Sequence, residues 1–128
     1  MDVYLVDRSP ENRARLSSVI ETIAGAHVAG HASTAAAAIA AILGTKPDVV
    51  LLDVNLEEGS GFQVLREVAA REPGIALYML SNYASEPYRR HARRMGALDF
   101  FDRTTELERL RAMLAARALA TRQPVAPL

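Results

Sequence analysis

The sequence predicts a doubly wound α/β fold, in which a parallel sheet of five strands is covered by helices on both faces. Two observations lead to this prediction. Five short apolar runs recur at nearly even spacing, and segments with helical periodicity lie between them. The chain has 128 residues, half of them hydrophobic and none of them cysteine. This length is enough for one domain whose hydrophobic core is stable without a disulfide.

The apolar runs are the expected strands, and they cover residues 3–6, 27–32, 48–53, 75–80 and 98–101. The third run contains the sequence VVLL, which is continuously apolar and begins with β-branched residues. Such a run is typical of a strand that is buried on both faces, as the central strands of a parallel sheet are.

The expected helices carry apolar residues at spacings of three and four. Their stripes include Leu16 and Ile20, Ile39 and Ile42, Phe62 and Leu65, Tyr88 and Ala92, and Leu107 and Leu110. We expect Ser33 or Thr34 to cap the second helix, and Thr104 or Thr105 to cap the last one. Gly44 is expected to supply the left-handed residue at the end of the second helix.

The composition narrows the classes of function. The formal net charge is zero, and the fifteen basic residues are fourteen arginines and Lys46, so bulk charge does not favour nucleic acid or a membrane surface. The absence of cysteine fits a reducing cytoplasm, which is the location we expect, and no secretory signal is visible. Arg89, Arg90, Arg93 and Arg94 are interpreted as a solvated helix face or, alternatively, as a docking surface for an acidic partner.

Polar residues stand at the carboxyl ends of four expected strands: Asp7, Asp53, Ser81 and Arg103. Ligands of doubly wound sheets bind at that edge, where the strand order reverses. In the order 2-1-3-4-5, Asp7 and Asp53 flank this switch point. Either carboxylate alone is explained as a loop or helix cap, but the two together favour a functional site.

Three segments resemble response-regulator receiver domains. PDVVLLDVNLEEGSGFQVLREV (47–68) resembles the central segment of that family, MLSNYA (79–84) its fourth strand end, and GALDFFDRTTELERL (96–110) its fifth strand and last helix. The resemblance covers about residues 3–117 and implies a flavodoxin-like fold and a bacterial, cytoplasmic phosphoprotein of a two-component system. We expect a receiver domain over residues 1–119 and a short tail over residues 120–128.

The resemblance also implies roles for single residues. Asp53 matches the phosphoacceptor, which receives a phosphoryl group from a sensor histidine kinase or a phosphotransfer protein. Asp7 matches one member of the acidic pair that helps to hold Mg²⁺. Asn55 matches the position whose backbone carbonyl is a metal ligand, and Gly61 matches the glycine that lets the loop turn.

The switch of the family implies two further residues. Ser81 matches the hydroxyl that bonds a phosphoryl oxygen, and Phe100 matches the aromatic switch residue on the fifth strand. The face formed by the fourth helix, the fifth strand and the fifth helix then changes shape and meets a downstream protein. The chain is expected to be a monomer or a weak homodimer, with no membrane partner and no direct nucleic-acid partner.

The sequence departs from the family at the charged positions. Arg8 replaces the second acid of the pair, Arg103 replaces a lysine, and Glu57 stands where proline is frequent. Two carboxylates, Asp7 and Asp53, and two arginines sum to zero without any metal. Because added Mg²⁺ would leave an excess positive charge in a partly desolvated crevice, we expect its binding to be weakened. No nucleotide or flavin is expected, since the DRSPEN loop (7–12) lacks a glycine-rich cradle.

These departures leave several interpretations open. Arg8 either pairs with Asp53 in place of a metal or points to solvent, and Glu57 or Glu58 could supply the missing acid. Tyr83, like Asn55, would border the site and tune the lifetime of the phosphoryl group.

Three functions follow from these interpretations. The first is a receiver phosphorylated on Asp53, with no enzymatic activity beyond its own phosphorylation and dephosphorylation. The second is an atypical receiver that acts as an adaptor or dimerisation module without phosphorylation, because of Arg8 and Arg103. The third is a phosphatase with Asp7 as its nucleophile. Ser9 stands where such enzymes carry a second acid, which argues against this function.

Overall fold

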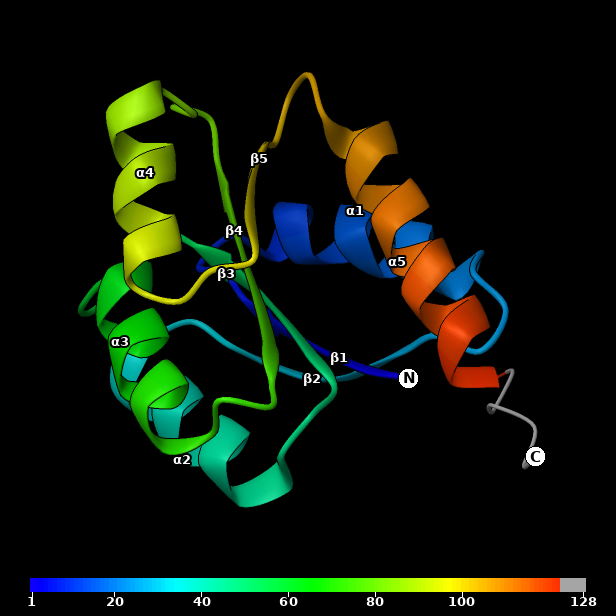
Figure 1. The fold of residues 1–128 in the computed structure, drawn as a ribbon, viewed down its shortest axis with the longest axis horizontal. Helices are drawn as coiled ribbons and strands as arrows, with labels where there is room; N and C mark the ends of the chain where they lie inside the picture. Colours follow the sequence, from blue (N-terminus) through cyan, green and yellow to red (C-terminus); the bar gives the residue numbers. More distant parts are fainter. Residues whose placement is uncertain (123–128) are drawn as a thin grey trace, which may run out of the picture.

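The structure is a computed structural model and describes residues 1–122 (Figure 1). One parallel sheet has the strand order β2-β1-β3-β4-β5, as the sequence predicts. The strands are β1 (Asp2–Val6), β2 (His27–Ala32), β3 (Val49–Asp53), β4 (Ala76–Ser81) and β5 (Asp99–Asp102). The helices are α1 (Pro10–Glu21), α2 (Ala35–Thr45), α3 (Gly61–Arg71), α4 (Glu86–Arg94) and α5 (Leu107–Arg122).

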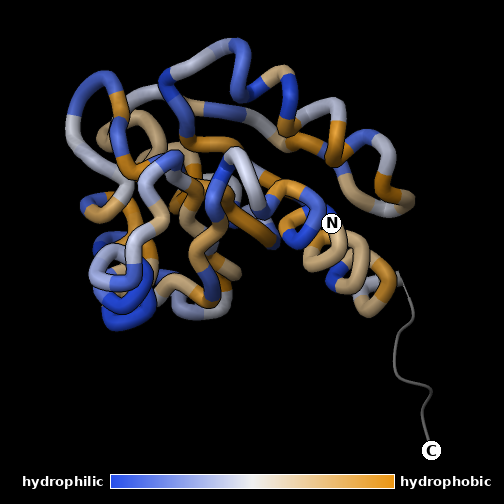
Figure 2. Tube along the Cα trace, turned by 90° about the horizontal axis from the view of Figure 1, so that it is seen from above, coloured by the Kyte–Doolittle hydropathy of each residue, from blue (hydrophilic) through white to orange (hydrophobic). Residues whose placement is uncertain are grey.

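The sheet separates two hydrophobic clusters. One packs the sheet against α2, α3 and α4, and the other packs it against α1 and α5. Neighbouring residues of β1 contribute to opposite clusters, since Val3 and Leu5 lie in the second and Tyr4 and Val6 in the first. Figure 2 shows hydrophobic and hydrophilic stretches that alternate along the chain. Both faces are therefore buried, as the continuous apolar run of β3 predicts.

Helix caps agree with the sequence in part. The Thr34 side chain caps α2 by accepting from the amide of Ala37 at 3.2 Å. The left-handed residue after α2 is Lys46 (φ 49°) rather than Gly44, which lies inside the helix. Helix α2 therefore ends later than the glycine predicts. Lys46 can adopt the left-handed conformation because that conformation costs a residue other than glycine only a modest amount of free energy.

The start of α5 also differs from the prediction. The helix begins at Leu107, and the amide of Leu110 bonds to the carbonyl of Glu106 at 3.0 Å. Thr104 belongs to the preceding turn, where its amide and hydroxyl both donate to Asp102. The predicted threonine cap is therefore wrong, since Asp102 organises the turn before the helix.

The end of the chain lies partly outside the description. Helix α5 continues to Arg122, past the expected domain limit at residue 119, while residues 123–128 of the expected tail lie outside the described residues. Over residues 1–122, no helix has the length and apolar character needed to cross a membrane.

Candidate functional site

A cavity of about 290 Å³ opens at the carboxyl ends of the central strands. Its lining includes six of the residues that the sequence singles out: Arg8, Asp53, Asn55, Ser81, Tyr83 and Arg103. They come from the last residues of β3 and β4 and from the loops after β1, β3, β4 and β5, because parallel strands all end at one edge of the sheet. Asp7 lies behind this lining and is almost completely buried.

The guanidinium group of Arg103 lies between the two carboxylates. Its Nη2 is 2.9 Å from Asp7 Oδ2 and 3.7 Å from Asp53 Oδ1. Arg103 is itself buried, with 7% of its surface exposed, and its backbone amide donates to the carbonyl of Ser81. Arg103 is therefore held as a fixed positive charge inside the site.

The contact between Arg103 and Asp7 is an ion pair without an aligned hydrogen bond. Asp7 Oδ1 accepts from the amide of Ser9 at 2.9 Å, but Asp7 Oδ2 makes no hydrogen bond with the described residues. Arg103 Nη2 is equally buried and equally without a hydrogen bond there. Buried polar atoms of this kind are rare, because each costs the free energy of its lost hydration. The site therefore has an unused acceptor and an unused donor.

Asp53 has an altered tendency to ionise. Burial raises the pKa of its carboxyl group above the usual value, while the charge of Arg103 lowers it and the charge of Asp7 raises it. Backbone amides of Val54 and Asn55 partly offset the burial. An aspartate with this combination of burial and charged neighbours in an open cavity is typical of a functional carboxylate.

Ser81 is oriented by the next loop. Its Oγ accepts a hydrogen bond from the amide of Tyr83 at 3.0 Å, and the residue is 5% exposed. Because this contact uses the oxygen as an acceptor, the hydroxyl proton remains available for donation to an oxygen in the cavity. Tyr83 itself is 74% exposed and stands at the rim.

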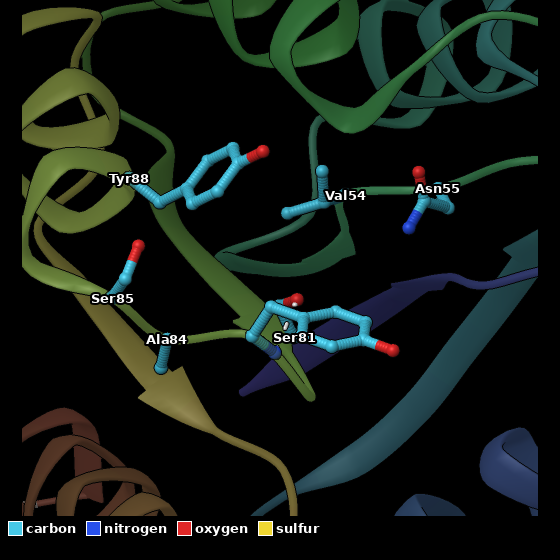
Figure 3. A pocket seen from close by; sticks show the side chains of 7 residues that line it. Val54, Asn55, Ser81, Ala84, Ser85 and Tyr88 are labelled. Atoms are coloured by element: carbon cyan, nitrogen blue, oxygen red, sulfur yellow. Dashed lines mark hydrogen bonds between the residues drawn. The ribbon is translucent and has the colours of Figure 1, made fainter.

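A second cavity of about 380 Å³ adjoins the first and shares Asn55, Ser81 and Tyr83 with it. Figure 3 shows the ring of Tyr88 pointing toward Val54 across this cavity. The adjoining cavity is bordered by the loop between β4 and α4 and by the first turn of α4. Movement of that loop would therefore change the shape of both cavities.

Gly61 is needed for a reason other than the turn. A Cβ atom at this position would lie 2.1 Å from the carbonyl oxygen of Asp53, which is a severe overlap. The glycine with a left-handed conformation in this loop is Gly59, with φ of 80°. Gly61 thus lets the start of α3 approach the backbone of Asp53.

Arg8 points to solvent, as one of its two interpretations expects, and Glu57 does not take the place of the missing acid. Arg8 is exposed at the rim of the cavity, and the guanidinium beside Asp53 belongs to Arg103. The carboxylate of Glu57 accepts from the hydroxyl of Ser33 at 3.2 Å and is not part of the lining. The pairing of Arg8 with Asp53 and the replacement of the missing acid by Glu57 are therefore both wrong.

The donor set does not fit a tightly held Mg²⁺. This ion needs near-octahedral oxygen ligands, and the oxygens here are those of Asp7, Asp53 and Asn55. The cationic Nη2 of Arg103 contacts the first two, and within residues 1–122 no three acidic or histidine side chains form a metal-binding group. A metal at this place would have to displace the guanidinium or share the carboxylates with it.

Comparison with known proteins agrees with the fold. The family model described as response regulator receiver domain matches residues 3–115. The chain is 30% identical over 98 residues to chemotaxis protein CheY of Thermotoga maritima, covering 77% of this chain and 81% of that protein. It is 32% identical over 84 residues to the DNA-binding transcriptional activator DevR/DosR of Mycobacterium tuberculosis, covering 66% of this chain.

That match covers only 39% of DevR/DosR, and the chain spans half or less of the length of several other curated relatives. Among solved structures, the response regulator domain of Thermotoga maritima CheB superimposes with a TM-score of 0.80. Its sequence identity is 22%, and the match covers 99% of this chain and 98% of that one, so it supports the fold. Taken with the strand order and the carboxylates at the strand ends, these matches show that the chain belongs to the response-regulator receiver domain family.

Proposed function

We propose that the chain accepts a phosphoryl group on Asp53 from a sensor histidine kinase or a phosphotransfer protein. The observation that carries this proposal is the placement of Asp53 in an open cavity beside the hydroxyl of Ser81 and the guanidinium of Arg103. As a receiver domain, the chain fits a regulator rather than an enzyme, and Asp53 needs only to accept and release the group.

In the proposed transfer, a carboxylate oxygen of Asp53 forms a bond to phosphorus. The bond from phosphorus to the imidazole nitrogen of the partner's phosphohistidine breaks, and its electron pair leaves with the imidazole. The protein contributes position and charge: Arg103 compensates the negative oxygens, and Ser81 donates its hydroxyl proton to one of them. The rim residues Asn55 and Tyr83 control how water reaches the product, and with it the lifetime of the phosphoryl group.

Receiver domains generally bind Mg²⁺ at this site, and bound metal would supply positive charge to the phosphoryl oxygens. We infer that the binding is weakened in this chain, because Arg103 already occupies the space between Asp7 and Asp53 and Arg8 supplies no carboxylate. Arg103 then carries most of the charge compensation that the metal and a lysine carry elsewhere in the family. Weak binding predicts that millimolar rather than micromolar Mg²⁺ is needed to perturb the site.

The signal would pass through Ser81 and Phe100 to the surface of α4, β5 and α5, which meets a downstream protein. Phe100 is completely buried in this structure and packs in the cluster beneath α3 and α4. We infer that the switch starts from a state with the aromatic ring already inside. The chain is then expected to work in the cytoplasm as a monomer or a weak homodimer, without direct contact to nucleic acid.

The test is phosphorylation by a small-molecule phosphodonor, followed by intact mass spectrometry. Wild type is expected to gain one phosphoryl group, and Asp53→Asn none. Parallel reactions with Mg²⁺ and with a chelator separate the acceptor role from the metal requirement. An absent adduct in wild type, or an equal adduct in Asp53→Asn, would overturn the proposal, and a calorimetric titration showing micromolar Mg²⁺ affinity would overturn the weakened metal site.

A second function is favoured by one observation. Arg103 bridges Asp7 and Asp53 in the way that a bound cation would, so the site is neutralised without any signal. On this alternative, the chain is a constitutive adaptor or dimerisation module that needs no phosphorylation. A robust adduct on Asp53 would exclude it, whereas an inert Asp53 together with a partner that binds the untreated protein would favour it.

A further inference from the structure

Arg89 joins three segments that are distant from one another in the sequence. From the first turns of α4, its Nε donates to the carbonyl of Ala84 at 3.0 Å and its Nη1 to the carbonyl of Phe100 at 2.6 Å. Its Nη2 donates to the carboxylate of Glu106 at 2.5 Å. The side chain is 18% exposed, so the expected solvated face does not include Arg89.

Glu106 completes the connection at the start of α5. The carboxylate oxygen that Arg89 contacts also accepts from the amide of Asp102 at 2.9 Å. The other oxygen accepts from Nε of Arg109 at 2.9 Å, while Arg109 Nη1 donates to Asp99 at 2.7 Å. We call the ion pair of Arg89 and Glu106 the clasp.

The clasp connects the two loops that hold the site residues. Ala84 belongs to the loop that follows Ser81, and Asp102 directly precedes Arg103. The same two loops meet inside the site, where the amide of Arg103 donates to the carbonyl of Ser81. In Figure 1, β5 lies at the edge of the sheet between α4 and α5, so the clasp spans the outer side of the strand.

We propose that Arg89 and Glu106 are positioning residues for the acceptor site. The clasp fixes the distance between the β4–α4 loop and the β5–α5 loop, and thereby places the Ser81 hydroxyl and the Arg103 guanidinium relative to Asp53. The inference rests on the proposed function of Asp53 and adds to it a route by which α4 and α5 control the site.

The geometry of Arg89 explains why charge alone is insufficient for this role. Three of its nitrogens point to three acceptors, two of which are backbone carbonyls of different segments. A lysine at this position would keep the charge but could not span the same acceptors from one planar group. Arg90, on the same helix, is exposed and offers a matched control.

The experiment compares Arg89→Ala, Arg89→Lys, Glu106→Gln and the double variant Arg89→Ala/Glu106→Gln with wild type, and uses Arg90→Ala as the control. The first readout is the NMR signal of the Arg103 side-chain Nε–H and the amide signal of Tyr83. Both signals are expected to shift in the four clasp variants and to stay in place in Arg90→Ala. Unfolding curves, measured in parallel, identify any variant that fails to fold.

The second readout is the lifetime of the phosphoryl group on Asp53 after loading with a small-molecule phosphodonor. Each single clasp variant is expected to change the lifetime about fivefold or more, with no rescue by lysine. The double variant should match the larger single effect, since both changes break the same connection.

Two outcomes would overturn the inference. One is loss of stability without any shift at Arg103 and Tyr83, which would make the clasp merely structural. The other is a double variant whose change in phosphoryl-group lifetime is the product of the two single changes, because the two residues would then act independently. If wild type takes up no phosphoryl group, the proposed function fails, but the NMR comparison still tests the clasp by itself.

Discussion

Two arginine–carboxylate pairs lie near the same edge of the sheet and differ in how well they are hydrogen-bonded. Arg103 and Asp7 are 7% and 2% exposed in their side chains, and the atoms that face each other make no aligned hydrogen bond. Arg89 and Glu106 are 18% and 24% exposed, and each accepts or donates several aligned hydrogen bonds. A buried ion pair with poor hydrogen bonds costs the fold free energy, because its charges lose their hydration. A partly exposed pair whose polar atoms are hydrogen-bonded does not carry this cost.

The difference separates a pair at the cavity from a pair that holds two loops together. The clasp lies at the outer edge of β5, where Arg89 and Arg109 both donate to the carbonyl of Phe100. The pair in the cavity instead retains one free donor and one free acceptor beside Asp53.

Removal of Arg103 should have the largest effect on stability. In Arg103→Ala, Asp7 stays buried without a cation, which is expected to lower the free energy of unfolding by about 3–5 kcal/mol. Mg²⁺ should restore part of this loss, because the space between the two carboxylates becomes free for a cation. Urea unfolding with and without Mg²⁺ measures both effects, and Arg8→Ala, at the exposed rim, is the matched control. Equal losses in the two variants would contradict the assignment of the fixed charge to Arg103.

Removal of Arg89 should have a smaller effect. Arg89→Ala loses hydrogen bonds to two carbonyls and a carboxylate, but water can enter the space that the side chain leaves at the edge of the sheet, so a loss of about 2 kcal/mol is expected. Amide exchange of the β4–α4 loop and of the first turn of α5 should rise together, since one side chain joins them. A rise confined to α4 would contradict the connection across β5.

The sequence predicts the fold and the location of the site. It does not predict that the arginine beside Asp53 is Arg103 and not Arg8. Strand periodicity and the strand ends bring Asp7, Asp53, Ser81 and Arg103 together without further information. The strand pairing of β1 continues through Asp7, whose amide donates to the carbonyl of Ala32 at 3.0 Å. Successive side chains of an extended chain point to opposite sides, so the neighbour of a buried Asp7 points outward.

Packing between distant segments explains the remaining misses. Glu106 lies 17 residues after Arg89. Spacing rules for one helix cannot predict this contact, because it joins α4 to the residue before α5. The role of Gly61 depends on how closely α3 approaches the carbonyl of Asp53, a distance that tertiary packing sets. Neither feature has a sequence signal apart from the residue type itself.

The clasp should make stability fall in strong acid. The hydrogen bond from Arg89, followed by that from the amide of Asp102, lowers the pKa of Glu106 from 4.5 to about 2. Because the folded-state pKa lies below the unfolded value, the stabilisation is complete above 4.5 and is lost as the pH falls toward 2. Solvent screening limits the effect to about 1 kcal/mol. Glu106→Gln should flatten the stability–pH curve in this range, whereas Glu108→Gln on the exposed surface should leave it unchanged.

Neutralising Asp53 should give the smallest effect, with the opposite sign. Burial raises the pKa of Asp53 above its usual 3.8, so the unfolded state loses its proton first, and wild-type stability falls as the pH rises through this range. Asp53→Asn removes this cost and should stabilise the fold at neutral pH by less than about 1 kcal/mol.

The decisive comparison for Asp53 is with the other carboxylate. Asp7→Asn removes the partner at 2.9 Å from Arg103 and should destabilise the fold, while Asp53→Asn removes only the contact at 3.7 Å. Urea unfolding of both variants from acidic to neutral pH measures the two signs. Destabilisation by both would mean that Arg103 holds the carboxylates equally. Opposite signs would mean that Arg103 belongs chiefly to Asp7, and that Asp53 is the carboxylate left available for phosphorylation.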